Sequence, residues 1–268
     1  MIVVFFGVTV LLVLIAIEVG YRLGFAVHKS SEEEKESPVS AIAGATMGLL
    51  AFILAFTFAI VADRYDTRKA LVRDDANSIR TAYLRSDFLP ESDREKAAGL
   101  LATYTNMNLT AGRAIAVDTV RKTAAEMQGI QRQLWEMAVA NARLDMNSDV
   151  AALYIESLNE LINVHALRVT IGIDSRLPTE IWLVLFSLLI LTMLGFGYQT
   201  AIAGSGRSWA IPLLALAFSV VLTLIALLDR PESGYFRPSQ KPLEVVLAEM
   251  ATAIEDRQPR QAIPEGGR

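Results

Sequence analysis

Four long runs of the sequence contain no charged side chain, and they constrain the fold more than any other feature. They cover Met1–Ile17, Pro38–Ala62, Ile181–Gly206 and Ser208–Leu228. A helix needs about 20 residues, and at least about 17, to cross about 30 Å of hydrocarbon, so each run can span a bilayer. Because the runs are continuously apolar rather than alternating, they predict helices. The sequence therefore predicts an all-α integral membrane protein with four transmembrane helices.

The composition agrees with a chain that is only partly in lipid. Hydrophobic residues make up 53% of the sequence and charged residues 20%, which is too many charges for a protein wholly buried in a membrane. The first run lacks the basic start and the cleavage site of a secretion signal, so we expect it to be retained as a helix.

Lysine and arginine fall mostly on one side of the predicted membrane. Four spans place the N-terminus, residues 63–179 and the chain after residue 228 on one side, and two short loops on the other. Only four of the 25 basic residues lie on the loop side, namely Arg22, Lys29, Lys35 and Arg207. Because basic residues are enriched in cytoplasmic segments, we expect both termini to be cytoplasmic. The acidic loop HKSSEEEKES is interpreted as a solvated linker, with a ligand site as the alternative.

Residues 63–179 are predicted to form a cytoplasmic helical bundle inserted between the second and third spans. We expect the second span to continue without a break to Leu89-Pro90, because no glycine or proline intervenes. Further helices are expected at about Glu91–Val117, from a cap at Asp118, and from Asn147-Ser148.

Four segments follow from this organisation. Residues 1–62 form the first transmembrane hairpin, 63–179 the cytoplasmic domain, 180–228 the second hairpin, and 229–268 a cytoplasmic C-terminal motif and tail. The tail after about Ile254 is polar and rich in proline and glycine, so we expect it to be disordered.

The sequence gives no sign of an enzyme, a cofactor or a metal site. Cysteine is absent, which excludes disulfides and thiolate ligands. His28 and His165 are isolated and are interpreted as structural. Asp74 and Asp75 are adjacent on a predicted helix, so they diverge by about 100° and lack the spacing of metal ligands. The net charge of −4 does not suggest a nucleic-acid partner.

The second predicted span has two neighbouring faces of different bulk. One carries the small residues Gly44, Gly48, Ala51, Ala55 and Ala59, and the other carries Phe52, Phe56 and Ile60 at a spacing of four. Small residues let another helix approach closely, and a ring of bulky residues can form a constriction that gates by dewetting. The pattern suits a pore helix in a symmetric oligomer, with ordinary helix packing as the alternative.

Glu18 is the acidic residue nearest the interior of a predicted span. Arg22 follows it by four residues, close to the end of the first span. We therefore interpret the two as a local ion pair at the membrane surface, with an ion or proton relay as the alternative.

Two stretches of the sequence resemble the bestrophin-like domain family of bacterial membrane proteins. They are LAFTFAIVADRYDTRKALVRDDANSIRTAYLR, which runs on from the second span, and DRPESGYFRPSQKPL, which follows the fourth. The resemblance covers Gly44–Arg85, the third and fourth spans and the motif after them. It implies a multi-pass protein of the bacterial inner membrane and a homo-oligomer, which is a pentamer in bestrophins. It also implies a pore along the second span that passes inorganic anions.

In bestrophins the neck of the pore consists of three bulky apolar residues on the second span, and Phe52, Phe56 and Ile60 match that pattern. The partial positive charge of aromatic ring edges can favour anions. The acidic calcium clasp of animal bestrophins has no counterpart near Asp229, so no calcium gating is expected. The alternative function is a non-conducting scaffold or stress-signalling protein whose cytoplasmic helices bind partners. A small-solute transporter is a third possibility.

Charged residues gather where the second and fourth spans leave the predicted membrane. They are Asp63, Arg64, Asp66 and Arg68 after the second span, and Asp229, Arg230 and Arg237 after the fourth. We expect Arg230 or Arg237 to pair with Asp63 or Asp66 and to tie the two helices together at the pore exit. Pro231, Gly234 and Pro238 would turn the chain there. Contact of these arginines with lipid headgroups is the alternative.

Overall fold

The protein is all-helical in its computed structural model, which describes residues 2–30, 36–114, 116–173, 175–205, 209–230 and 236–257. These residues form eight α-helices and one short 3-10 helix, with no strand. The elements are α1 (Ile2–Ser30), α2 (Glu36–Arg85), η1 (Ser86–Phe88), α3 (Glu91–Arg113), α4 (Val117–Ala142), α5 (Asp149–Ile173), α6 (Thr179–Ile202), α7 (Ala210–Asp229) and α8 (Lys241–Arg257).

Four helical segments are long and apolar enough to cross a membrane. They are Ile2–His28, Pro38–Phe88, Thr179–Ile202 and Ala210–Asp229. The four predicted transmembrane helices are therefore confirmed as helices of suitable length and composition. The second segment continues well past any bilayer thickness, because nothing between its apolar and charged parts interrupts the helix.

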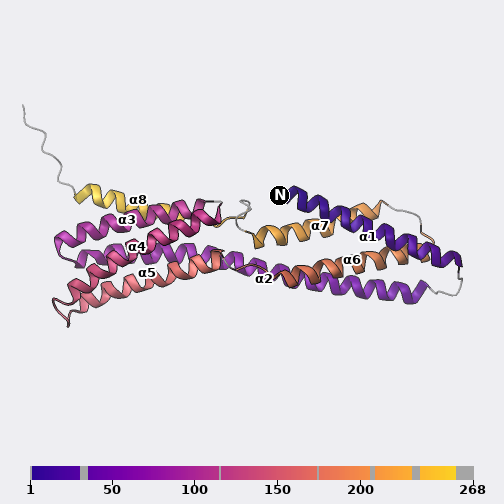
Figure 1. The fold of residues 1–268 in the computed structure, drawn as a ribbon, viewed down its shortest axis with the longest axis horizontal. Helices are drawn as coiled ribbons and strands as arrows, with labels where there is room; N and C mark the ends of the chain where they lie inside the picture. The colour runs from indigo at the N-terminus through magenta and orange to yellow at the C-terminus, as the bar shows by residue number, and fades with distance from the viewer. Residues whose placement is uncertain are drawn as a thin grey trace, which may run out of the picture. The chain divides into compact units, whose positions relative to one another are not determined.

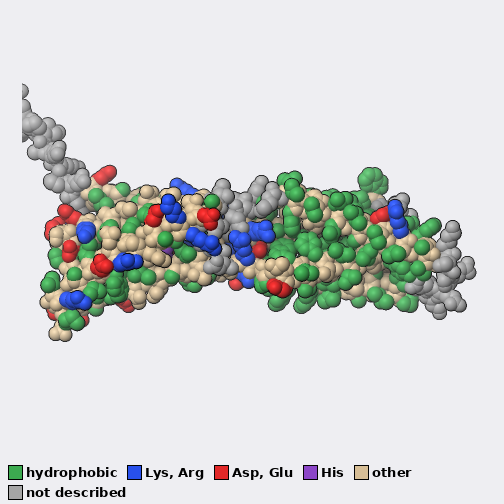
Figure 2. Space-filling model, viewed as in Figure 1, with side chains coloured by type: hydrophobic (Ala, Val, Ile, Leu, Met, Phe, Trp, Pro, Cys, Tyr) green, Lys and Arg blue, Asp and Glu red, His purple; other side chains and the backbone are tan. Residues whose placement is uncertain are grey.

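The chain divides into two compact units, which we call the apolar unit and the polar unit. The apolar unit comprises Met1–Tyr65 with Arg176–Phe236, and the polar unit comprises Asp66–Ser175 with Arg237–Arg268. On the face shown in Figure 2, hydrophobic side chains cover the apolar unit, whereas charged side chains are spread over the polar unit. Each unit has its own hydrophobic core.

In the apolar unit, α1 and α6 run in the same direction with their backbones in close contact (Figure 1). A methyl group added to Gly20 would overlap the carbonyl oxygen of Leu194, and one added to Gly197 would overlap that of Ile17. Gly24, one turn after Gly20, meets the α6 backbone in the same way. Glycine at these positions permits the close approach that small residues provide between membrane helices.

Helix α2 lies antiparallel to α6. Thr192 donates a hydrogen bond to the carbonyl oxygen of Thr46 (3.3 Å), and Gln199 Nε2 donates to Ser40 Oγ (3.0 Å). One face of α2 is buried against the unit, as shown by its core residues Leu50, Leu54 and Val61. The opposite face of α2 is left uncovered by the other residues that the structure describes.

The polar unit packs α3, α4, α5 and α8 with the second half of α2 (Figure 1). Its fully buried residues include Ile79, Leu101, Tyr104, Leu134, Leu158 and Leu161. Helix α8 belongs to this core, because Leu243, Val246 and Met250 are buried in it. Helix α8 lies in the segment that the sequence predicts only as a C-terminal motif and tail.

Two helix boundaries in the polar unit differ from the predictions: α3 ends at Arg113, four residues before the expected Val117, and the cap of α4 is displaced. Helix α2 ends at Arg85 and η1 at Phe88, directly before Leu89-Pro90. Ser148 Oγ accepts a hydrogen bond from the Ala151 amide (3.2 Å), which starts α5 as expected. Helix α4 begins at Val117 with Ala116 in the capping position, so the cap expected at Asp118 is wrong by two residues. The predicted tail lies largely outside the described residues.

Candidate functional site

The exposed face of α2 presents aromatic side chains at the level of the predicted span. Phe52 and Phe56 are 64% and 62% exposed within the single chain, and their rings stack with centroids 6.4 Å apart. Ile60 differs from them, because it is half-buried and packs against the core of the apolar unit. Two of the three residues predicted for the pore neck therefore project fully from the chain.

The small residues of α2 lie beside this aromatic pair and are also uncovered. Nothing lies within 4 Å of the positions that a Cβ would occupy on Gly44 and Gly48. Ala51, Ala55 and Ala59 are exposed as well. Among the described helices, the small face therefore has no close partner, unlike Gly20, Gly24 and Gly197 of α1 and α6.

An ion pair links α2 and α7 at the end of the apolar unit. Arg64 Nη1 lies 3.9 Å from Asp229 Oδ1, and the same oxygen accepts a hydrogen bond from the Leu177 amide (2.7 Å). Asp229 is only 3% exposed, so its carboxylate depends on these partners for compensation. This pair differs from the predicted one, because the base comes from α2 and the acid from α7.

The other charged residues predicted at the exit have different partners. Asp66 pairs with Lys69 on its own helix (3.3 Å), and Arg237 donates to the carbonyl oxygen of Arg113 (2.7 Å). Arg68 is buried, whereas Asp63 and Arg230 are exposed. Pro231 and Gly234 of the predicted turn lie outside the described residues.

In the second half of α1, Glu18 and Arg22 form the predicted local ion pair. Arg22 Nε lies 2.8 Å from Glu18 Oε1, and both side chains are accessible. An exposed pair at this spacing contributes little to stability, about 0.3–0.5 kcal/mol. The geometry supports the local interpretation of these two residues.

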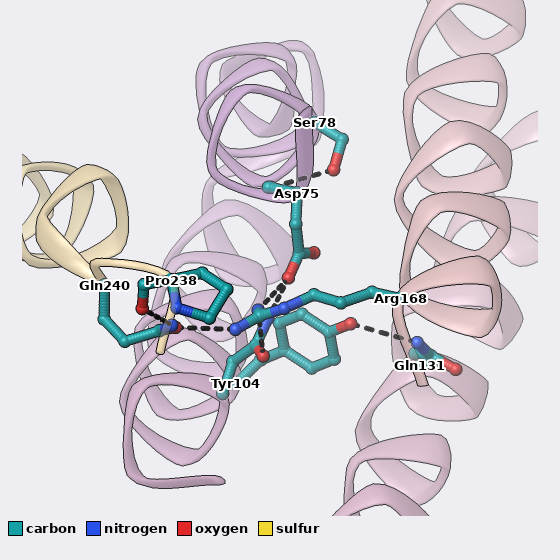
Figure 3. Close-up of polar contacts among 8 residues, drawn as sticks. Asp75, Ser78, Tyr104, Gln131, Arg168, Pro238 and Gln240 are labelled. Carbon is teal, nitrogen blue, oxygen red and sulfur yellow. Dashed lines mark hydrogen bonds and ion pairs between the residues drawn. The ribbon is translucent and has the colours of Figure 1, made fainter. Parts of the chain in front are cut away.

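A network of buried and partly buried polar side chains joins four segments of the polar unit (Figure 3). Arg168 on α5 forms an ion pair with Asp75 on α2, and its Nη1 also donates to Asn108 Oδ1 on α3 (2.6 Å). Its Nη2 donates to Gln240 Oε1 just before α8 (2.6 Å). Asn108 Nδ2 donates to Asp75 Oδ2 (2.5 Å). A single guanidinium thus connects α2, α3, α5 and the start of α8.

Gly112 makes room for this network. A Cβ at Gly112 would collide with the side-chain amide of Gln240 and would press on the Arg168 guanidinium. Gln240 is in turn held by its own hydrogen bond to the Pro238 carbonyl oxygen (2.8 Å). The motif after the fourth span therefore takes part in the polar unit through Pro238 and Gln240.

His165 and Tyr104 lie beside the network, with ring centroids 5.7 Å apart. Burial lowers the pKa of His165, and both of its ring nitrogens lack a hydrogen-bond partner among the described residues. Burial also raises the pKa of Tyr104 well above its ordinary value, and the nearby Asp75 carboxylate acts in the same direction. The Tyr104 hydroxyl accepts a hydrogen bond from Gln131 (3.1 Å). Both groups are therefore held in their neutral forms at neutral pH.

Sequence reasoning singled out Asp75 and His165 but did not connect them with Asn108, Arg168 or Gln240. Asp74 and Asp75 do diverge, since Asp74 is exposed and Asp75 is buried. Within the described part of the chain, no cluster of three or more histidine, cysteine, aspartate or glutamate side chains could hold a metal ion. The polar network connects α2, α3, α5 and the start of α8.

These features define an all-helical membrane protein whose second span runs on into a separate helical unit. The profile of the Bestrophin-like domain matches residues 7–243, and the chain belongs to this family. The family predicted from the two sequence motifs is thus confirmed.

Solved structures of similar fold include bacterial membrane proteins. A variant of a bestrophin homologue from Klebsiella pneumoniae is 16% identical, with a TM-score of 0.64, over 94% of this chain and 98% of that one. A second variant of that homologue is 16% identical with a TM-score of 0.60, over 96% and 98%. A variant described only as a membrane protein is 17% identical with a TM-score of 0.61, over 96% and 97%. At these identities the likeness shows the fold alone. No curated protein matched the sequence.

Proposed function

We propose that the chain is one subunit of a bestrophin-like oligomeric channel in the bacterial inner membrane, and that α2 lines a pore for inorganic anions. The observation that carries the proposal is the uncovered face of α2. A monomer would expose two stacked phenylalanines and an adjacent stripe of small residues. In a ring of subunits, the small stripe would receive a neighbouring helix and the aromatic pair would face the axis.

The chemistry of that face suits anions rather than cations. Phe52 and Phe56 carry no charge, and their ring edges are partially positive. The uncharged run of α2 from Pro38 to Ala62 places no acidic side chain at this level. The charged residues of the exit, including Arg64, would then lie on the cytoplasmic side together with both termini.

Conduction is tested by recording purified wild-type protein in planar bilayers beside Phe52→Ala/Phe56→Ala. We expect an anion-selective current whose amplitude or selectivity changes in the double variant, because both bulky rings are removed from the constriction. Phe58→Ala is the matched control, since Phe58 is an aromatic residue on a different face of the same helix. The proposal fails if wild type passes no current, or if the double variant conducts as wild type does.

Assembly is tested separately by counting subunits. Gly48→Leu places a bulky side chain on the small stripe of α2 and should dissociate the oligomer. The leucine would have room within its own subunit, but it would collide with a neighbouring subunit packed against the stripe. Gly7→Leu, at an equally open position on α1, is the control. Native mass spectrometry measures the result. A stable oligomer without current would instead favour the non-conducting scaffold.

A further inference from the structure

A pocket of about 430 Å³ lies at one end of the apolar unit, where α1 and α6 begin and α7 ends. Its size is within the range of about 300–1,000 Å³ that is usual for pockets holding small organic molecules. The lining comes from the three helices together with the residues that flank them, Arg176 and Arg230. None of the residues assigned above to the pore face of α2 takes part in it.

One wall of the pocket is aromatic and preformed. The ring of Phe5 contacts those of Trp182 and Phe186 edge-on, each at a centroid distance of 6.1 Å. Trp182 and Phe186 stack on each other at 6.1 Å. Thr223 and Ala226 of α7 also line the pocket. This wall suits a hydrocarbon chain, because its rings are locked by mutual packing and carry no charge.

The rim of the pocket is positively charged. Arg176 and Arg230 line it, and both side chains are exposed. The acidic lining residue, Asp229, is buried and engaged by the Leu177 amide and by Arg64. Because the charge of Asp229 is compensated from within the protein, this carboxylate does not offset the positive charge of Arg230.

The position of the pocket along the helices indicates the kind of ligand. It lies at the ends of three candidate membrane spans, where a tryptophan such as Trp182 marks the boundary between hydrocarbon and water. An aromatic wall below a basic rim at this level matches an acyl chain below a phosphate. We propose that the pocket binds one anionic phospholipid, with its headgroup phosphate at Arg230 and one acyl chain against the aromatic wall. The inference requires membrane insertion but not conduction.

Trp182 makes the proposal directly measurable. The chain has three tryptophans, so Trp135→Phe/Trp209→Phe leaves Trp182 as the single fluorescent reporter. This protein is titrated in detergent with phosphatidylglycerol whose acyl chains carry bromine, which quenches tryptophan on contact. Brominated phosphatidylcholine with the same chains is the comparison. We expect quenching at about threefold to tenfold lower concentrations of phosphatidylglycerol, the preference that one or two surface arginines confer.

Variants of the rim and the wall separate the pocket from general lipid contact. Arg230→Gln should abolish most of the preference for phosphatidylglycerol, whereas Arg22→Gln, at the far end of α1, should leave it unchanged. Ala226→Phe fills the pocket and should weaken quenching by the phosphatidylglycerol. Glycerol phosphate, which has the charge but no chain, should compete poorly. All variants are first shown to melt at the wild-type temperature.

Equal quenching by the two lipids in wild type would overturn the proposal. So would a preference that survives both Arg230→Gln and Ala226→Phe. Strong competition by glycerol phosphate would also overturn it, because the pocket would then recognise a soluble phosphate and not a lipid. None of these outcomes bears on whether α2 lines a pore.

Discussion

Arg168 on α5 forms an ion pair with Asp75, a fully buried carboxylate on α2. Removing one member of such a pair leaves the other charge uncompensated, whereas removing both does not. We predict that Arg168→Met lowers the free energy of unfolding of the polar unit by about 3–5 kcal/mol. Asp75→Asn/Arg168→Met should recover part of that loss. Chemical unfolding of the full chain in detergent, followed by circular dichroism, measures both.

Arg80→Met is the control for this prediction. Arg80 pairs with Glu249 at 2.7 Å, but both side chains are substantially exposed. Exposed pairs contribute about 0–1 kcal/mol, so the control should change little. If Arg168→Met and Arg80→Met lowered the free energy of unfolding equally, the network around Arg168 would contribute no more than an exposed ion pair.

The contact between α1 and α6 predicts that alanine substitutions at two nearby glycines have very different effects on stability. Gly197→Ala places a methyl group on the carbonyl oxygen of Ile17, whereas Gly195→Ala meets open space. Overpacking of this kind costs about 1–3 kcal/mol. We expect Gly197→Ala to lower the melting temperature of the protein in detergent and Gly195→Ala to leave it unchanged. Similar melting temperatures would contradict the close approach of the helices.

His165 predicts a dependence of stability on pH. Burial lowers its pKa from the ordinary 6.5, with Asp75 opposing and Arg168 reinforcing the effect. The unfolded chain therefore binds a proton that the folded chain does not. The stability contributed by neutral His165 is full above pH 6.5 and is lost as the pH falls through the interval between the two pKa values.

We expect His165→Gln to flatten the fall in melting temperature below pH 6.5. His28, the other histidine in the chain, is exposed, so His28→Gln should keep the wild-type slope. Melting curves collected between pH 5 and pH 8 make the comparison. A wild-type slope in His165→Gln would assign the pH dependence to other groups.

Substitutions at two nearby positions of α8 are predicted to differ in their effect on stability. Leu243 is completely buried in the polar core, whereas Val245 is 42% exposed. Leu243→Ala should cost about 2–5 kcal/mol through the cavity it leaves, and Val245→Ala should have little effect. Hydrogen exchange of α8 peptides measures the result. Unchanged protection in Leu243→Ala would mean that α8 is not held by the core.

Much of this architecture was predictable from the sequence because it depends on local patterns. An uncharged run of about 20 residues has to be helical in lipid, since its backbone groups can only be satisfied within the segment. The continuity of α2 followed from the absence of glycine and proline up to Leu89-Pro90. The two sequence motifs predicted the family, and the Glu18–Arg22 pair followed from its spacing of four.

The contact between α1 and α6 and the helix α8 also have local sequence patterns, but neither was predicted. Gly20 and Gly24 repeat at the spacing of four that brings membrane helices together. The same spacing was interpreted as a packing face only at Gly44 and Gly48 of α2. Leu243, Val246, Leu247 and Met250 repeat at i, i+3, i+4 and i+7, which is the apolar stripe of an amphipathic helix. Both patterns indicate a packing face, but neither pattern names the helix that packs against it.

The partners themselves were decided by tertiary structure alone. The residues that meet Arg168 come from 93, 60 and 72 positions away along the chain, and the acid paired with Arg64 lies on α7. A charged side chain at the end of a helix could form an ion pair with any of several oppositely charged side chains. Which one it meets depends on how the helices pack, and that is a property of the whole fold. The sequence determined which four segments form helices of membrane-spanning length and that α2 continues beyond its apolar part, whereas packing determined which of their charges and glycines are in contact.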